Sequence, residues 1–192
     1  MMFTFIVEFI ALVLLIGGSW HASRYEGRGF AQQWFVGAYL AAVIRETLNQ
    51  VVFQVYQFSP DVMRVGAAPA LVTMLGAGVY YLAFQFARRF VDANKPGWMA
   101  GLVFLITASF ALPIEATAAQ LNWWLYARPS IIAFGVPMAS LLVWGGGAAI
   151  FYALFWRVRQ TRLPERGKLY AMVTLAPVIA VGQLLLVVLL NA

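Results

Sequence analysis

Three glutamates lie inside long apolar stretches of this chain of 192 residues: Glu8, Glu46 and Glu115. An ionisable side chain inside a membrane is costly to bury, so it marks a functional site by default. With a helical rise of about 1.5 Å per residue, Glu8 lies about 9 Å from the outer end of its predicted helix. By the same rise, Glu46 and Glu115 lie about 17 Å from theirs. If those helices are neighbours, the three carboxyl groups can line one cavity that opens to the outside.

Polar and aromatic side chains extend this pattern along two predicted helices. In the helix predicted over 33–58, one face carries Glu46, Gln50, Gln54 and Gln57, with Asn49, Phe53 and Tyr56 at its edge. A polar stripe of that length must face protein or water and not lipid. In the helix predicted over 97–125, one face carries Glu115, Asn122 and Tyr126, beside Trp123 and Trp124. Together these side chains predict a pocket of carboxyl groups, amides and aromatic rings.

Such a pocket suits acid catalysis on an apolar substrate. A carboxylic acid in an apolar site keeps its proton at neutral pH and can donate it to a carbon–carbon double bond. Aromatic faces then stabilise the carbocation, and water or an internal double bond captures it. We therefore predict Glu46 and Glu115 as the acid and its partner. The predicted substrate-binding residues are Arg45, Asn49, Gln50, Gln54, Tyr56, Asn122, Trp123 and Tyr126.

The same residues also have a purely structural interpretation. Arg45 is adjacent to Glu46, and such a pair can form a buried salt bridge with no chemistry. Amides commonly join helices in membranes, and tryptophan and tyrosine form belts at the membrane interface. For His21 and Arg24 we expect interfacial positions.

Transmembrane helices are the elements that must position these residues. Hydrophobic residues make up 63% of the chain and charged residues 10%, against roughly 25% charged in soluble domains. A spanning helix needs about 20 apolar residues, and six stretches qualify: 2–20, 33–58, 67–90, 97–125, 130–156 and 169–190. Pro113 lies inside the fourth, which is expected to kink or to end early. We predict an all-α integral membrane protein with six transmembrane helices in a single polytopic domain, 1–192.

The lysines and arginines predict the orientation of this domain. The first, third and fifth connections contain ten of the 13 basic residues, whereas the second and fourth contain only Arg64 and Arg128. The positive-inside rule then places both termini on the non-cytoplasmic side, and we expect a bacterial inner (cytoplasmic) membrane. The net charge of +6 follows from this topology, so no nucleic-acid partner is predicted. Cysteine is absent and there is one histidine, so no metal or cofactor is predicted.

The sequence also suggests a parallel internal repeat. Glu46, Tyr56 and Gly66 to Pro69 recur as Glu115, Tyr126 and Gly135 to Pro137, with an offset of 68 to 70 residues. Each unit is a helix with a carboxylate, an aromatic outer end, a short turn and a Gly/Pro start to the next helix. Both units enter from the same side, unlike the inverted repeats of many transporters.

One stretch resembles a pattern in a known family. Glu115, Asn122-Trp-Trp-Leu-Tyr126, Phe134-Gly-Val-Pro-Met138 and Leu142-Val-Trp144 are similar to the carotenoid biosynthesis membrane-protein family, which includes carotenoid hydratases. In that family an acidic residue precedes an aromatic cluster, a Gly-Val-Pro step and a tryptophan. Glu46, Tyr56 and Gly66 to Pro69 resemble a related arrangement in the earlier half. The resemblance covers about 100 of the 192 residues and implies hydration of a terminal double bond of an acyclic carotenoid, a lyase-type reaction.

Three functions are therefore open at this point. The first is a membrane enzyme that hydrates or cyclises an isoprenoid or carotenoid. The second is a non-enzymatic accessory subunit of a larger membrane complex that contacts lipid or pigment. The third is the substrate-binding membrane component of a small-molecule transporter. The expected partners are an apolar isoprenoid or lipid ligand, membrane lipids and other membrane subunits.

Overall fold

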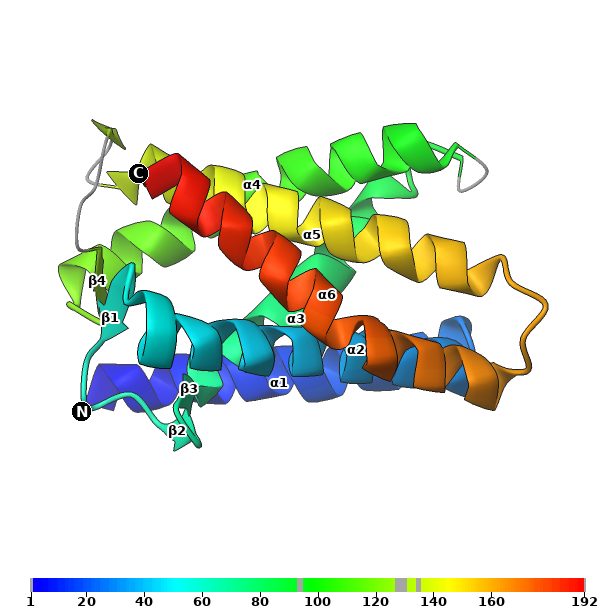
Figure 1. The fold of residues 1–192 in the computed structure, drawn as a ribbon, viewed down its shortest axis with the longest axis horizontal. Coiled ribbons are helices and arrows are strands. Elements are labelled where there is room, and N and C mark those ends of the chain that lie inside the picture. The colour runs from blue at the N-terminus through cyan, green and yellow to red at the C-terminus, as the bar shows by residue number, and fades with distance from the viewer. Residues whose placement is uncertain (1, 93–94, 127–130, 134–135, 192) are drawn as a thin grey trace.

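In the computed structural model, the described residues are 2–92, 95–126, 131–133 and 136–191. This part of the chain contains six α-helices: α1 (Met2–Tyr25), α2 (Arg28–Leu48), α3 (Ala70–Ala87), α4 (Pro96–Gln120), α5 (Met138–Arg159) and α6 (Glu165–Asn191). Most lie along the long axis of the molecule, and α6 crosses the bundle diagonally (Figure 1). The predicted all-α class is confirmed.

Within the described residues, five helices are long and apolar enough to cross a membrane: α1, α3, α4, α5 and α6. Several apolar helices of this kind are typical of a multi-pass membrane protein. Helix α2 has 21 residues but is more polar, because it carries Gln32, Gln33, Arg45 and Glu46. In α3, 83% of the residues are buried, whereas the apolar stretch of α1 is only 11% buried. Helix α3 therefore lies inside the bundle, and α1 covers it from outside.

The prediction of continuous helix over 33–58 and 97–125 is wrong at the outer ends. Helix α2 ends at Leu48 and passes through one π-helical turn, η1 (Asn49–Phe53), into strand β1 (Tyr56–Phe58). Helix α4 ends at Gln120, and strand β4 (Trp124–Tyr126) follows. Left-handed residues make both breaks, with φ of 50° at Gln54 and 51° at Asn122. Asparagine tolerates this region better than most residues, which accounts for Asn122 but not for Gln54, and hydrophobic periodicity indicates neither break.

At the opposite end of the bundle, α1 and α2 are longer than predicted. The predicted connection over 21–29 is largely helical, because α1 continues to Tyr25 and α2 begins at Arg28. The predicted alternative in which Pro113 ends its helix early is wrong. Helix α4 runs through Pro113 to Gln120, and the Thr117 hydroxyl donates a hydrogen bond of 2.8 Å to the Pro113 carbonyl. The Thr117 side chain thus donates a hydrogen bond to a backbone carbonyl one turn earlier in the helix.

The two units of the predicted repeat share one order of elements. The first runs from α2 through β1 and the hairpin of β2 (Arg64–Val65) and β3 (Ala68–Pro69) into α3. The second runs from α4 through β4 and the hairpin of β5 (Ile132–Ala133) and β6 (Val136–Pro137) into α5. Strands β1 and β4 pair antiparallel, with Tyr56 opposite Tyr126. The predicted turn over 127–130, with Arg128, and Gly135 lie outside the described residues.

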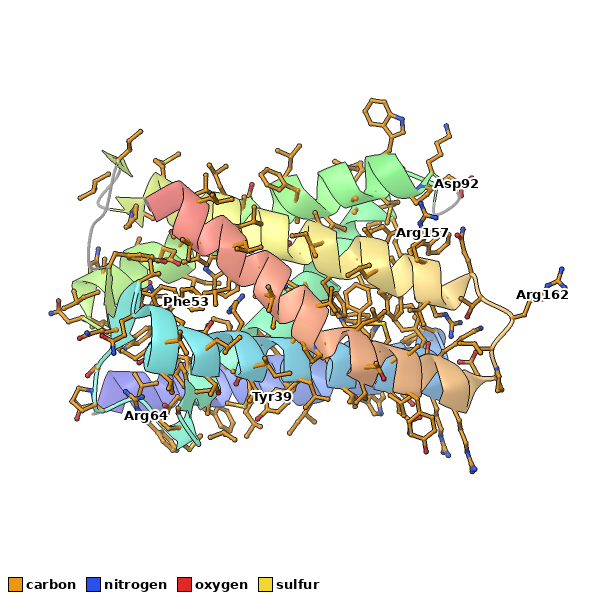
Figure 2. The ribbon with its side chains drawn as sticks, viewed as in Figure 1. Tyr39, Phe53, Arg64, Asp92, Arg157 and Arg162 are labelled. Atoms are coloured by element: carbon orange, nitrogen blue, oxygen red, sulfur yellow. The ribbon has the colours of Figure 1, made fainter. Side chains whose placement is uncertain are left out.

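The strands and the basic connections lie at opposite ends of the bundle. Helix α1 begins and α6 ends at the end that carries β1 and β4 (Figure 1). Arg157 and Arg162 lie at the other end, away from Arg64 (Figure 2). Glu46 with Tyr56 and Glu115 with Tyr126 therefore lie near one end of the bundle, and most of the positive charge lies at the other.

Candidate functional site

Glu46 is held in a buried ion pair on α2. Its side chain is fully buried, and its Oε1 accepts hydrogen bonds from Arg45 Nε at 2.8 Å and Nη2 at 2.5 Å. The Tyr56 hydroxyl, which β1 brings back over the end of α2, donates to both carboxylate oxygens at 3.0 and 2.9 Å. A charge-assisted network of this kind is strong and geometrically specific. Glu46 therefore has Arg45 as a dedicated cationic partner.

A glutamine from α6 supports the arginine of this pair. Arg45 Nη1 donates to Gln183 Oε1 at 3.4 Å, and Gln183 Nε2 donates to the Gly147 carbonyl at 3.0 Å. The absence of a side chain at Gly147 is required here. A Cβ at that position would lie 2.7 Å from the Tyr80 hydroxyl and 3.3 Å from Gln183 Nε2.

Glu115, on α4, has a different environment. It is buried and accepts indole N–H hydrogen bonds from Trp144 on α5 at 2.9 Å and from Trp124 on β4 at 3.0 Å. The Tyr126 hydroxyl donates from 3.4 Å. Among the described residues, no cationic side chain pairs with Glu115. Its hydrogen-bond donors are neutral, whereas Glu46 has an arginine.

A small cavity lies between the two carboxyl groups. Its volume is about 30 Å³, which is room for one or two water molecules. The lining residues are Arg45, Glu46, Tyr56, Phe58, Val72, Glu115, Trp124, Tyr126, Val143, Trp144 and Val187. Polar groups converge on it from both units of the repeat, so a water molecule there would find the two or more partners that it needs.

A second, more apolar cavity reaches Glu115 from the other side. It has a volume of about 170 Å³, and its walls include Ala119, Leu125, Ile132 and Pro137. Glu115, Trp124 and Tyr126 line this groove as well as the small cavity. The Glu115 carboxyl group therefore lies between a space of the size of water and a groove that can take an apolar group.

Asn49 and Gln50 position the first tyrosine through its backbone. Asn49 Nδ2 donates to the Tyr56 carbonyl at 2.9 Å, and its Oδ1 accepts from the Val55 N–H at 3.1 Å. Gln50 Nε2 donates to the same Tyr56 carbonyl at 3.1 Å. These side-chain hydrogen bonds take the place of the α-helical backbone hydrogen bonds that end after Leu48. Asparagine side chains commonly offer the backbone such an alternative to a helix.

The structure brings together Arg45, Glu46, Tyr56, Glu115 and Tyr126 but not all the predicted residues. Gln54 and Asn122 are exposed, because each occupies the left-handed turn where its helix ends. Trp123 is buried but lies behind Trp124, with ring centroids 6.4 Å apart. The predicted polar stripe therefore stops at Gln50.

The prediction that Glu8 shares this cavity is also wrong. Its carboxylate accepts a hydrogen bond of 2.8 Å from the Met63 backbone N–H. Met63 lies in the loop between β1 and β2. Glu8 therefore joins α1 to the loop between β1 and β2 and lines neither cavity beside Glu115.

Three residues of the site are not among the predicted catalytic and substrate-binding residues: Trp124, which the sequence places only beside the predicted pocket, Trp144 and Gln183. Trp124 and Trp144 belong to the stretch with the family resemblance, so that pattern contained the signal. Gln183 is the one polar side chain in the apolar run 175–190. An amide in such a run is expected to face protein, which was a usable signal.

No family model, characterised protein or solved structure matches this chain. The fold has several apolar helices, which are compatible with a multi-pass membrane protein, and two buried glutamates lie at the junction of its two similar units. In the described part of the chain, no group of three or more His, Asp or Glu side chains is arranged to hold a metal ion.

Proposed function

We propose that this protein is a membrane enzyme that adds a proton and a water molecule to a double bond at the end of an isoprenoid chain. The observation that supports this function best is the place of Glu115. It lines both the water-sized cavity and the apolar groove, and its hydrogen-bond donors among the described residues are neutral. A buried carboxyl group without a counterion is well suited to carry a proton.

The reaction uses the two glutamates in different roles. Glu115 gives its proton to one carbon of the double bond, and the cation forms on the more substituted carbon between the Trp124 and Tyr126 rings. Water in the small cavity forms the new carbon–oxygen bond and releases a proton to the Glu46 carboxylate. That proton returns to Glu115 through Tyr56 and Tyr126, whose ring centroids are 5.4 Å apart. The alkene and water are consumed, and an alcohol is formed.

The size of the groove supports a small, branched apolar terminus as the reacting group. A cavity of about 150 Å³ lined by apolar side chains binds benzene, and the groove beside Glu115 has about 170 Å³. One five-carbon isoprene unit fits such a space, while the rest of a long substrate would lie in the bilayer. The resemblance to carotenoid hydratases points to the same substrate class. In cyclisation an internal double bond captures the cation in place of water, and the resulting cyclic cation then loses a proton to give a cyclic alkene.

The proposed topology has six spans with both termini outside, in a bacterial inner membrane. Helix α2, the most polar of the six, is the span that this topology adds to the five apolar helices. Its Arg45 and Glu46 neutralise each other inside the bundle. Cysteine is absent from the sequence, so single-cysteine variants report sidedness directly. Arg162→Cys is expected to react with an impermeant maleimide only after the membrane is opened, and Arg64→Cys in intact cells. The reverse pattern would overturn the orientation.

The activity test uses purified protein, an acyclic isoprenoid with a terminal isopropylidene group, and water labelled with ¹⁸O. The expected product is a tertiary alcohol that carries the label. Glu115→Gln removes the proton donor and is expected to lower the rate by about 10²- to 10⁴-fold. Glu8→Gln makes the same change at a carboxyl group outside the cavity and is expected to keep the rate. Full activity in Glu115→Gln would exclude this mechanism.

A second function is a non-enzymatic subunit in which the polar cluster only joins helices. The small size of the cavity between the carboxyl groups, about 30 Å³, favours this alternative, because no organic ligand enters it. In that case Glu115→Gln would change stability without any product to lose, and the protein would co-purify with other membrane subunits. A purified single chain that forms the alcohol would exclude this alternative.

A further inference from the structure

A separate groove lies on the outside of the bundle between α1 and α3. Its volume is about 410 Å³, within the range of ligand sites. Its walls include Val13, Leu14 and Leu82, and its polar lining residues are His21, Tyr81, Gln85 and Arg89. From Val13 to His21 the groove follows α1 for about 12 Å at the helical rise. It ends at the basic end of the bundle, away from Glu46 and Glu115, where Gln85 donates a hydrogen bond of 3.4 Å to Glu26.

Glycine keeps this groove open. At Gly17, which lines it, an added Cβ would meet nothing within 4 Å. At the next residue, Gly18, a Cβ would lie 3.0 Å from Phe35 and 3.4 Å from Tyr81. Gly18 thus serves helix packing, whereas Gly17 faces open space. A larger side chain at Gly17 would fill the groove without disturbing the helix contact.

The polar end of the groove presents positive charge. Arg88 is paired with Glu26, but the adjacent Arg89 is exposed and makes no ion pair with the described residues. Its guanidinium lies 5.8 Å from the Phe86 ring centroid. His21 Nδ1 lies 2.8 Å from the Tyr81 hydroxyl, which orients its ring at the same end of the groove.

We propose that this groove binds one anionic phospholipid. An acyl chain lies along α1 and α3, and the headgroup phosphate lies at Arg89, within reach of His21. The argument is charge complementarity, because basic pockets between membrane helices bind anionic headgroups and a guanidinium matches phosphate geometry. The site requires only that α1 and α3 span a membrane, so it does not depend on the chemistry of Glu115.

The test is native mass spectrometry of the purified full chain titrated with phosphatidylglycerol or with phosphatidylcholine of the same acyl chains. Phosphatidylglycerol is expected to bind more tightly. Arg89→Gln is expected to weaken phosphatidylglycerol binding about fivefold, the value of one basic side chain at an anionic surface, and to leave phosphatidylcholine unchanged. Arg162→Gln, on the connection between α5 and α6, is the matched control and is expected to have no effect.

A second pair of variants tests the acyl-chain part of the groove. Gly17→Leu is expected to abolish binding of both lipids, and Leu82→Trp fills the same space from α3. Gly101→Leu, on the exposed face of α4 where a Cβ also meets nothing within 4 Å, is expected to bind like the parent chain. Equal affinity for the two lipids, equal losses in Arg89→Gln and Arg162→Gln, or unchanged binding in both groove variants would each overturn the proposal.

Discussion

Removal of Arg45 tests whether its pair with Glu46 is a buried charge pair. In Arg45→Met the Glu46 carboxylate keeps only the Tyr56 hydroxyl, and Gln183 loses the guanidinium. Breaking a buried pair by removing one partner costs about 3–5 kcal/mol, because the remaining charge is left without a counterion. We therefore expect Arg45→Met to lower the free energy of unfolding by about that amount.

The double variant separates the charge from the packing. In Arg45→Met with Glu46→Gln no charge remains, and the amide at position 46 can still accept from Tyr56. We expect this double variant to lie about 1 kcal/mol below the parent chain, the size of one ordinary hydrogen bond. The two changes are then strongly non-additive: even if Glu46→Gln alone cost nothing, the fall from about 3–5 to about 1 kcal/mol is a coupling of at least about 2–4 kcal/mol.

The assay is equilibrium unfolding in mixed detergent micelles with increasing dodecyl sulfate, followed by circular dichroism. Arg88→Met is the matched control, because Arg88 also pairs with a glutamate but its side chain is 38% exposed. An exposed pair contributes about 0–1 kcal/mol. If Arg45→Met costs no more than Arg88→Met, or if the changes at 45 and 46 simply add, the reasoning from burial is refuted.

Two further changes test the donors and the packing around the site. Trp144→Phe keeps a ring but removes the indole N–H that donates to Glu115, so unfolding should become easier by about 1–3 kcal/mol; an unchanged midpoint in the same detergent titration would contradict this hydrogen bond. Gly147→Ala places a Cβ 2.7 Å from the Tyr80 hydroxyl and should cost about 1–3 kcal/mol. Gly101→Ala meets open space and should instead stabilise the helix by up to about 1 kcal/mol; similar effects of the two alanines would argue against the close contact at Gly147.

Composition and apolar run length were sufficient to predict the helical bundle. Runs of about 20 apolar residues have few alternatives, and all six predicted stretches contain helix in the structure. Their outer ends could not be predicted from periodicity, because Gln54 and Asn122 leave the helix through single left-handed residues. The side-chain bonds of Asn49 that make the first break possible depend on where the chain goes next.

The sequence indicates the two glutamates of the candidate site but not the geometry of the residues around them. Glu46 and Glu115 stand out in any apolar run, and their offset indicated equivalent positions. Helical spacing predicts Gln54 and Asn122 beside them. That spacing does not hold beyond Gln50 in the first unit or beyond Gln120 in the second. Of the two indole donors to Glu115, Trp124 reaches it from β4 after the turn at Asn122, and Trp144 reaches it from α5. The turn and the packing of α5 bring them there, and helical spacing does not predict either contact.

The antiparallel pairing of β1 with β4 relates the two equivalent strands by a local twofold axis. Residues that are 70 apart in the sequence face each other at Tyr56 and Tyr126, so the axis passes between these two tyrosines. A homodimer of a single unit would give both glutamates the same neighbours. Here the residue before Glu46 is Arg45, and the residue before Glu115 is Ile114. Because the two halves are joined in one chain, the two equivalent glutamates can differ. Glu46 has a charged neighbour in the sequence, and Glu115 has an uncharged one.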